Sequence, residues 1–283
     1  MPIRTRFAPS PTGHLHLGHV LAAQVAHDLA RSDPDGRFLL RHEDIDHSRT
    51  RPEYERSIED DLQFLGFTWD EPVIRQSERG PAYDVALQHL QSLNLVYPCF
   101  CTRKEIQAEW AAMAAAPHET GEHPYPGTCR HLTTAQRNVK IATGMPHAWR
   151  LDARAASPHC QSLSFHDLRH GTQAIDTAQV DDVVLARKDI GTAYHLAVVV
   201  DDAFQQISHV TRGEDLLTST PIHRILQHLL GFPEPSYLHH ALVLDNQGRR
   251  LAKRHDSLSI RQLRAAGNSP ADIQNMLKPW MSD

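Results

Sequence analysis

The chain has 283 residues, of which 40% are hydrophobic and 22% charged, and its formal net charge is −5 at pH 7. This length suggests about two domains with a substantial core, and the composition is ordinary for a soluble globular protein. The acidic balance argues against a protein that grips a long stretch of nucleic-acid backbone, so any RNA contact should be local. The longest apolar run, residues 196–200, is too short to span a membrane and no signal peptide is visible, so we expect a cytoplasmic protein with no membrane contact.

The first predicted elements are a strand, a loop and a helix. Ile3, Thr5 and Phe7 alternate with arginines, which is the pattern of a strand. Prolines and glycines interrupt regular structure up to residue 18, and apolar residues at helical spacing then predict a helix that ends before Pro34. The unpaired N–H groups and the positive dipole end of that helix would face the loop, which predicts a nucleotide phosphate site.

A second strand is predicted over residues 38–41, and Glu43 follows it, where the carboxyl end of a parallel strand opens onto a ligand. The next helix should begin at Pro52 and end at Gly66, because proline suits a first helical turn and glycine a helix end. Its apolar face, which we assign to the core, consists of Tyr54, Ile58, Leu62 and Leu65.

The composition changes from about residue 81 to residue 187, and we interpret this segment as an inserted subdomain. Thr102 and Glu105 predict a capping box for a helix that continues to Ala116. The four cysteines of the chain also lie in this segment. They are too few for a secreted disulfide scaffold, and their spacing points to a metal instead.

Three cysteines and a tyrosine form the candidate metal site. Cys99 and Cys101, with Tyr125 and Cys129, would offer a tetrahedral zinc three thiolates and a phenol. Two alternatives remain open. The thiols could be small buried side chains without a metal, or a nearby histidine could replace the tyrosine as fourth ligand, the candidates being His118, His123 and His131. A bound zinc would be structural, because it would hold a loop that has little core of its own.

The alternation of strands and helices returns after residue 187. Residues 196–204 have helical spacing, although their consecutive valines would also suit a buried strand. A strand is predicted over residues 207–210, and a helix from Thr220 to Gly231.

The C-terminal part begins near Pro233 and holds a basic loop over residues 249–254. It ends in a helix that Ser269 should cap and Pro279 should terminate. Taken alone, the basic loop would be a solvated turn.

Two distant segments together resemble a known enzyme family. Near the N-terminus the chain reads Arg6-Phe7-Ala8-Pro9-Ser10-Pro11-Thr12-Gly13 and then His16-Leu17-Gly18-His19, which resembles the HIGH motif and the lead-in of the glutamyl branch of class I aminoacyl-tRNA synthetases. Residues 250–254, Arg-Leu-Ala-Lys-Arg, resemble the KMSKS loop of that class, with arginine in place of its first lysine and alanine in place of its serine. The cysteine and tyrosine pattern is similar to the zinc site of the glutamyl and glutamyl-Q enzymes.

The fold class that this resemblance implies is α/β. It is a Rossmann-type doubly wound parallel sheet, split by an inserted α+β subdomain with a zinc site and followed by a short helical stem-contact region. The expected ranges are 1–82 for the first half of the catalytic domain, 83–186 for the inserted subdomain, 187–232 for the second half, and 233–283 for the stem-contact region with its KMSKS-like loop.

The resemblance also implies ATP and Mg²⁺ as cofactors, besides the structural Zn²⁺. The implied catalytic residues are His16, His19 and Lys253, which would stabilise charge that develops on the phosphates. The residues implied to bind ATP are His16, Gly18, His19, Arg250, Leu251 and Lys253.

The implied amino-acid substrate is glutamate. Its expected contacts are Arg6, Ala8, Ser10, Glu43, Tyr194 and Arg212. Glu43 would meet the substrate ammonium, and Arg212 would bind the side-chain carboxylate, because a planar guanidinium can make two parallel hydrogen bonds to a carboxylate. The alternative for Arg212 is a surface salt bridge with Glu214 or Asp215.

Only a short tail follows Arg254, where glutamyl-tRNA synthetases carry a helical region that reads the anticodon. The chain therefore most resembles the glutamyl-Q group, which lacks that region and attaches glutamate to queuosine in the anticodon loop of tRNA(Asp). We expect a monomer. The alternatives are a truncated or discriminating glutamyl-tRNA synthetase that charges the tRNA 3′ end, an adenylate-forming transferase acting on another acceptor, and a catalytically weak RNA-binding or regulatory paralogue.

Overall fold

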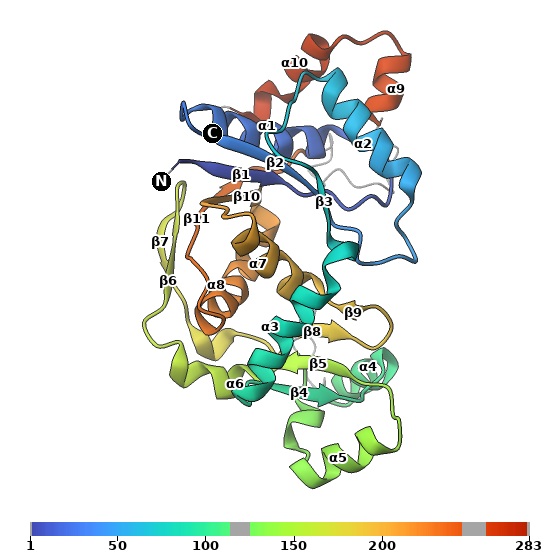
Figure 1. Ribbon diagram of the computed structural model, residues 1–283, viewed down its shortest axis with the longest axis vertical. Coiled ribbons are helices and arrows are strands. Elements are labelled where there is room, and N and C mark those ends of the chain that lie inside the picture. The colour runs from blue at the N-terminus through green and yellow to red at the C-terminus, as the bar shows by residue number, and fades with distance from the viewer. Residues whose placement is uncertain (1, 114–124, 245–258, 282–283) are drawn as a thin grey trace.

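The computed structural model describes residues 2–113, 125–244 and 259–281. In Figure 1 the molecule is elongated, with β1, β2 and the C-terminal helices at one end and β4, β5 and α5 at the other. Strands β10 and β11 and helices α7 and α8 lie between these ends. No helix in the described ranges is long and apolar enough to cross a membrane.

The N-terminal strands form a parallel sheet in the order β1-β2-β3. Its elements are β1 (Arg4–Phe7), β2 (Arg37–His42) and β3 (Ile74–Arg75). Helices α1 (Leu17–Arg31) and α2 (Pro52–Phe64) pack their apolar faces against it. Both predicted helices and the strand at residues 38–41 are confirmed, and Gly66 follows α2 with a φ of +86° that favours glycine.

The second sheet has the order β10-β11-β6-β7. Its parallel strands are β10 (His209–Gly213) and β11 (Ser236–His240), and a hairpin of β6 (Ser164–Asp167) and β7 (Gly171–Ala174) continues it. Strand β10 also lies beside β1. The Ser208 N–H donates to the Arg4 carbonyl, and the Arg6 side chain reaches the Thr211 carbonyl, so the two strands run in the same direction. The carboxyl ends of β1, β2 and β10 therefore open on one edge.

Two helices bury the face of these strands: α7 (Tyr194–Phe204) and α8 (Thr220–Leu229). The ambiguous valine segment is thus helical, and residues 196–202 are all buried. The predicted strand at residues 207–210 begins later, at His209. The reason is local, because the Ile207 N–H still bonds the Asp202 carbonyl at the end of α7 (2.8 Å).

The far end of the molecule contains an antiparallel sheet in the order β4-β5-β8-β9. Its strands are β4 (Val96–Cys99), β5 (Ala148–Leu151), β8 (Val184–Arg187) and β9 (Gly191–Thr192). The helices of this region are α3 (Gly80–Ser92), α4 (Arg103–Met113), α5 (Thr134–Ala142) and α6 (Ala153–Ala156). The capping box of α4 is confirmed by reciprocal hydrogen bonds between Thr102 and Glu105, and residues 114–116 lie outside the described ranges.

Short 3₁₀ helices connect these elements. They are η1 (Gln76–Arg79), η2 (Thr128–His131), η3 (Ser157–His159), η4 (Thr177–Gln179) and η5 (Glu214–Ser219). The division of the chain into four domain ranges stays a prediction.

The C-terminal helices are α9 (Ile260–Ala265) and α10 (Pro270–Met281), and α10 packs on α1. Ser269 caps α10 as predicted, since its hydroxyl accepts from the Asp272 N–H (3.2 Å). The prediction that Pro279 ends this helix is wrong, because the helix continues to Met281. A proline so close to the end removes one backbone hydrogen bond in the last turn, and few residues follow that it could disturb.

Candidate active site

The first part of the candidate site is the start of α1, beyond the carboxyl end of β1. His16 Nδ1 accepts from the Gly18 N–H (3.1 Å), and His19 Nδ1 accepts from the His16 N–H (3.2 Å). An accepting nitrogen carries no proton, so each neutral ring carries its proton on Nε2. The two rings lie together, with centroids 3.8 Å apart. Both therefore have an Nε2–H donor suited to a phosphate oxygen.

Gly18 leaves room for the His16 ring. A Cβ at this position would lie 3.0 Å from His16 Cε1, which is closer than real Cβ atoms ordinarily approach. Glycine therefore lets the imidazole cap the helix.

The C-terminal segment returns to this loop. Ser259 forms an isolated β-bridge with His16, and the Ile260 N–H donates to the Leu15 carbonyl (2.8 Å). Arg250, Leu251 and Lys253, which we expect to contact ATP, lie outside the described residues. The chain that follows them is nevertheless anchored beside the histidines.

A buried charge cluster lies behind the loop. Arg6 donates to both carboxylate oxygens of Asp202 (2.9 and 3.3 Å), and Arg41 donates to the same carboxylate (2.8 Å) and to the Gln205 amide oxygen (3.0 Å). Burial alone would raise the pKa of Asp202, but the two guanidinium groups outweigh it and hold the pKa below its ordinary value. Asp202 is therefore a fixed anion that aligns both arginines.

Glu43 lies at the edge of this cluster, where 14% of its side chain is exposed and one oxygen is 3.8 Å from Arg41 Nη2. Burial raises the pKa of Glu43 to about 7, against the opposing effect of the Arg41 and Arg6 charges. A carboxyl group in this state gains from an approaching cation, because the cation compensates for the lost hydration.

A cavity of about 150 Å³ borders Glu43. Its lining includes Ser10, Thr12, Glu43, Gln76, Arg187 and Tyr194. Gln76 is 1% exposed, and its Nε2 donates to Asp201 (2.9 Å). The structure therefore brings three of the predicted glutamate contacts, Ser10, Glu43 and Tyr194, to one cavity, and Ala8 lies half-buried directly after β1.

Arg212 lies at the carboxyl side of β10 and is 6% exposed. Its Nη1 donates to His223 Nδ1 (2.9 Å), while Nε and Nη2 have no hydrogen-bond partner within the described residues. Glu214 instead pairs with Arg169 (3.3 Å). Burial thus argues against the surface salt bridge considered as an alternative for Arg212, and its Nε and Nη2 groups have no acceptor in the part of the chain that the structure describes.

The charges of the site meet at Tyr194. Burial raises the pKa of its phenol, the Glu43 charge adds to the rise, and Arg212 and Arg6 oppose it. The Tyr194 ring also lies 5.5 Å from the ring of His223, which accepts from Arg212, so Tyr194 links the cavity beside Glu43 to the surroundings of Arg212. The site thus contains an acidic group, Glu43, and a guanidinium, Arg212. These two groups are complementary to the ammonium and the side-chain carboxylate of a small acidic amino acid.

Two histidines that lie beside Arg212 were not predicted as site residues from the sequence. His223 Nε2 lies 3.0 Å from His195 Nδ1, and the three side chains form a continuous hydrogen-bonded row. Burial and the Arg212 charge lower the pKa of His195 to about 4 and that of His223 well below its ordinary value. Both rings are therefore neutral at pH 7. A histidine inside the apolar face of a predicted helix, as at His223, was the available signal.

The candidate metal site is assembled as predicted around its thiols. The Sγ atoms of Cys99, Cys101 and Cys129 all lie within 4.8 Å of one another, and the Tyr125 hydroxyl is 3.3 Å from Cys101 Sγ and 3.4 Å from Cys99 Sγ. A tetrahedral zinc with Zn–S bonds of about 2.3 Å separates its sulfur ligands by about 3.8 Å. Hydrogen bonding with Cys99 also lowers the pKa of Cys129 to about 6, which favours a thiolate. The donor set therefore fits zinc.

The position of the fourth ligand favours tyrosine. His131 is exposed and does not belong to the thiol group, while His118 and His123 lie outside the described residues. The Tyr125 hydroxyl also accepts from the Cys129 N–H (3.0 Å), so it is held at the thiols.

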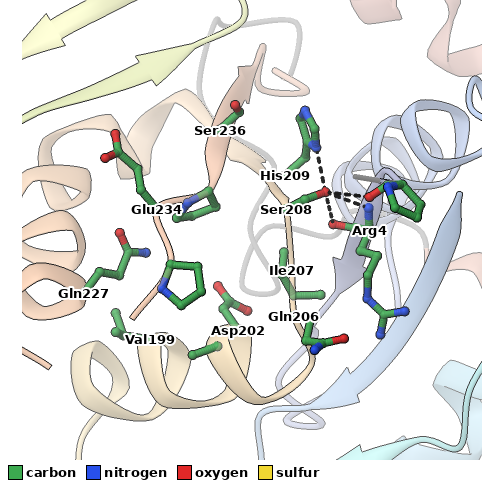
Figure 2. A pocket seen from close by; sticks show the side chains of 14 residues that line it. Arg4, Val199, Asp202, Gln206, Ile207, Ser208, His209, Gln227, Glu234 and Ser236 are labelled. Carbon is green, nitrogen blue, oxygen red and sulfur yellow. Dashed lines mark hydrogen bonds between the residues drawn. The ribbon is translucent and has the colours of Figure 1, made fainter. Parts of the chain in front are cut away.

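A second cavity, of about 670 Å³, opens at the amino ends of β10 and β11 (Figure 2). Three of its polar side chains have protein partners: Arg4 pairs with Glu71, Gln227 with Tyr237, and Glu234 with Arg224. Figure 2 also shows Ser208 bonded to Arg4 and to His209. Ligands of parallel sheets bind at the carboxyl ends of the strands, so this cavity is not the substrate site.

Comparisons with known proteins agree with this geometry. The family model for tRNA synthetases class I (E and Q), catalytic domain, matches residues 2–279. The chain is 47% identical over 282 residues to the glutamyl-Q tRNA(Asp) synthetase of Rhodobacter capsulatus, with 96% of this chain and 99% of that protein covered. It is 39% identical over 275 residues to the glutamate–tRNA ligase of Aquifex aeolicus, of which it spans 56%.

Among solved structures, the glutamate tRNA ligase of Elizabethkingia meningosepticum in complex with its amino acid has a TM-score of 0.76 at 30% identity. The match covers 90% of this chain and 52% of that one. The expected α/β class with a parallel sheet is thereby confirmed.

Proposed function

The chain belongs to the E and Q family of class I tRNA synthetases, and from this membership and its site we propose that it activates glutamate with ATP and transfers the glutamyl group to the queuosine of tRNA(Asp). The observation that carries the choice of amino acid is Arg212, a buried guanidinium whose Nε and Nη2 have no hydrogen-bond partner among the described residues. A substrate with one ammonium and a side-chain carboxylate satisfies both groups.

In the activation step the α-carboxylate oxygen of glutamate attacks the α-phosphorus of ATP, and the bond to the departing pyrophosphate breaks. The Nε2–H donors of His16 and His19 would stabilise charge on the phosphate oxygens, with Lys253 contributing from the KMSKS-like loop. Mg²⁺ bound to the triphosphate would neutralise part of its charge. No protein nucleophile is required, since positioning and electrostatic stabilisation supply the catalysis.

Glutamate is held at both ends in this proposal. Glu43 accepts hydrogen bonds from the ammonium, and Arg212 binds the side-chain carboxylate through Nε and Nη2. Ser10 and Tyr194 line the cavity beside Glu43, Ala8 would contact the substrate from the end of β1, and Asp202 holds Arg6 in place behind them.

In the transfer step a hydroxyl of the queuosine cyclopentenediol attacks the acyl carbon of glutamyl-adenylate, and AMP leaves. The decisive experiment incubates the protein with labelled glutamate, ATP and tRNA(Asp) that contains or lacks queuosine. Label should enter only the tRNA with queuosine, and nuclease digestion should recover it in the anticodon-loop fragment.

A second candidate is a glutamyl-tRNA synthetase that charges the tRNA 3′ end, because the Aquifex ligase is also similar over most of this chain. Label at the 3′-terminal nucleotide, with or without queuosine, would support that activity and contradict the first one. A chain that shows no glutamate-dependent exchange between ATP and pyrophosphate, with or without tRNA, would contradict both.

We also propose that the protein acts in the cytoplasm as a monomer.

We further propose that Cys99, Cys101, Tyr125 and Cys129 hold one structural zinc. The ion would join β4 to the η2 turn, where the packed cluster is small. Metal analysis of protein purified without added zinc should give about one equivalent, as a closed four-ligand site implies. A content near zero in folded, active protein would contradict the assignment.

A further inference from the structure

The histidines behind Arg212 have no part in the chemistry proposed above. We propose that His223 is a positioning residue that holds Arg212 for the side-chain carboxylate of glutamate by means of a neutral acceptor, and that His195 fixes the tautomer of His223. This inference rests on the proposed function, because it concerns how the same pocket reads a carboxylate.

The direction of the hydrogen bonds follows from the guanidinium. Arginine has only donors, so His223 Nδ1 must accept from Arg212 Nη1 (2.9 Å). The proton of His223 is then on Nε2, which donates to His195 Nδ1 (3.0 Å). His195 therefore carries its own proton on Nε2. Because Arg212 can only donate, it fixes the tautomers of both His223 and His195.

The imidazole of His223 orients the guanidinium of Arg212 without neutralising its charge. Arg212 is oriented at Nη1 by an uncharged ring, and its face lies 5.2 Å from the centre of the Tyr237 ring. No carboxylate in the described ranges forms an ion pair with it, and Nε and Nη2 lack partners there. A carboxylate in place of the imidazole would orient the guanidinium equally well but would neutralise it.

A buried guanidinium that is held in place without a counter-ion should bind a charged side chain better than a neutral one of the same shape. A carboxylate supplies both the missing acceptors and the missing counter-charge. An amide supplies one acceptor oxygen, and its NH₂ group would face a guanidinium donor. His223 should therefore contribute to the preference for glutamate over glutamine, in addition to its effect on glutamate affinity.

His223→Leu and His223→Asn separate this role from a general structural one. Leucine removes the acceptor, while the Asn Oδ1 can occupy the position of the imidazole Nδ1. In glutamate-dependent ATP–pyrophosphate exchange with the full chain, H223L should raise the KM for glutamate by about 10- to 100-fold, the effect of losing a hydrogen bond to a charged group. The KM for ATP should not change, and H223N should restore most of the loss.

The selectivity readout uses glutamine as a competitive inhibitor. The ratio of the glutamine inhibition constant to the glutamate KM should fall in H223L and recover in H223N. His228→Leu is the matched control, since His228 is an exposed histidine on the same helix whose partner is the His159 carbonyl. It should leave both constants unchanged.

Nitrogen-15 spectra of the unmodified protein provide an independent test. The His223 signal, assigned by its loss in H223N, should show an unprotonated Nδ1 and a protonated Nε2. The opposite tautomer, or a glutamate KM in folded H223L equal to that of the unmodified chain, would overturn the inference. If the unmodified chain itself shows no glutamate-dependent exchange, the proposed function fails instead.

Discussion

Arg6 and Arg212 lie on neighbouring parallel strands, and 6% of each residue is exposed, yet their guanidinium groups face different partners. Arg6 makes two contacts with the Asp202 carboxylate, which also pairs with Arg41. Arg212 is bonded to the neutral ring of His223. The two guanidinium groups are therefore equally buried, but a carboxylate neutralises Arg6 whereas a neutral imidazole leaves the charge of Arg212 uncompensated.

We propose that this difference separates a framework arginine, Arg6, from a recognition arginine, Arg212. The charge of Arg6 is matched within the protein by Asp202, which holds β1 against α7, and a direct contact of Arg6 with glutamate stays a prediction. We propose that a ligand carboxylate matches the charge of Arg212, because burying a guanidinium without a counter-ion is costly. Burial alone would not distinguish the two, whereas the identity of the partner does.

The largest expected effect is on the framework side. Asp202→Asn leaves the Arg6 and Arg41 charges buried without their counter-ion and should lower the free energy of unfolding by about 3 to 5 kcal/mol. Because the pKa of Asp202 is held below its ordinary value, the stabilisation is present at neutral pH and is lost as the pH falls through that lowered pKa.

Denaturant unfolding measures this change. Asp189→Asn is the control, since Asp189 pairs with Arg187 at the surface and is 59% exposed. That variant should change stability by less than about 1 kcal/mol. Equal stabilities of the two variants would contradict the framework role of Asp202.

The next effect is on the recognition side. Arg212→Ala should raise the KM for glutamate by roughly 30-fold or more, because a charged and bidentate contact is lost. The KM for ATP should stay unchanged. The exposed Arg154 offers the control Arg154→Ala. A glutamate KM unaffected by the loss of Arg212 would refute its assignment.

A pH dependence is expected at the ammonium end of the pocket. The pKa of Glu43 is raised to about 7, so below that pH the group becomes protonated and loses its attraction for the substrate ammonium. The KM for glutamate should rise by up to about tenfold for each pH unit below the pKa. Glu43→Gln should bind glutamate weakly at every pH, and a slope that persists in this variant would show that another group titrates.

The smallest effect concerns His195. His195→Leu removes the acceptor that fixes the His223 tautomer, and it should raise the glutamate KM by about 2- to 5-fold, as the loss of a neutral hydrogen bond implies. In the double variant with His223→Leu it should add nothing further, because His195 acts through His223. If the effects of the two substitutions on the glutamate KM were additive, His195 would not act through His223.

Local features of this protein could be predicted from its sequence. The helix start with His16, Gly18 and His19 uses contacts within four residues, and the caps at Thr102 and Ser269 do the same. Such hydrogen bonds depend only on neighbours in the chain, so motif and spacing were sufficient to predict the helix start and the caps at Thr102 and Ser269.

The tertiary structure decided which charges are paired. Asp202 meets Arg6 over a sequence separation of 196 residues, and His223 comes from a different element than Arg212 and His195. It also decided that the valine segment is a helix, because core residues surround it on several sides, and that Tyr125 lies at the thiols. Periodicity records burial and local geometry, but a counter-charge or a ligand comes from whichever segment folding brings near, and no local pattern contains that information.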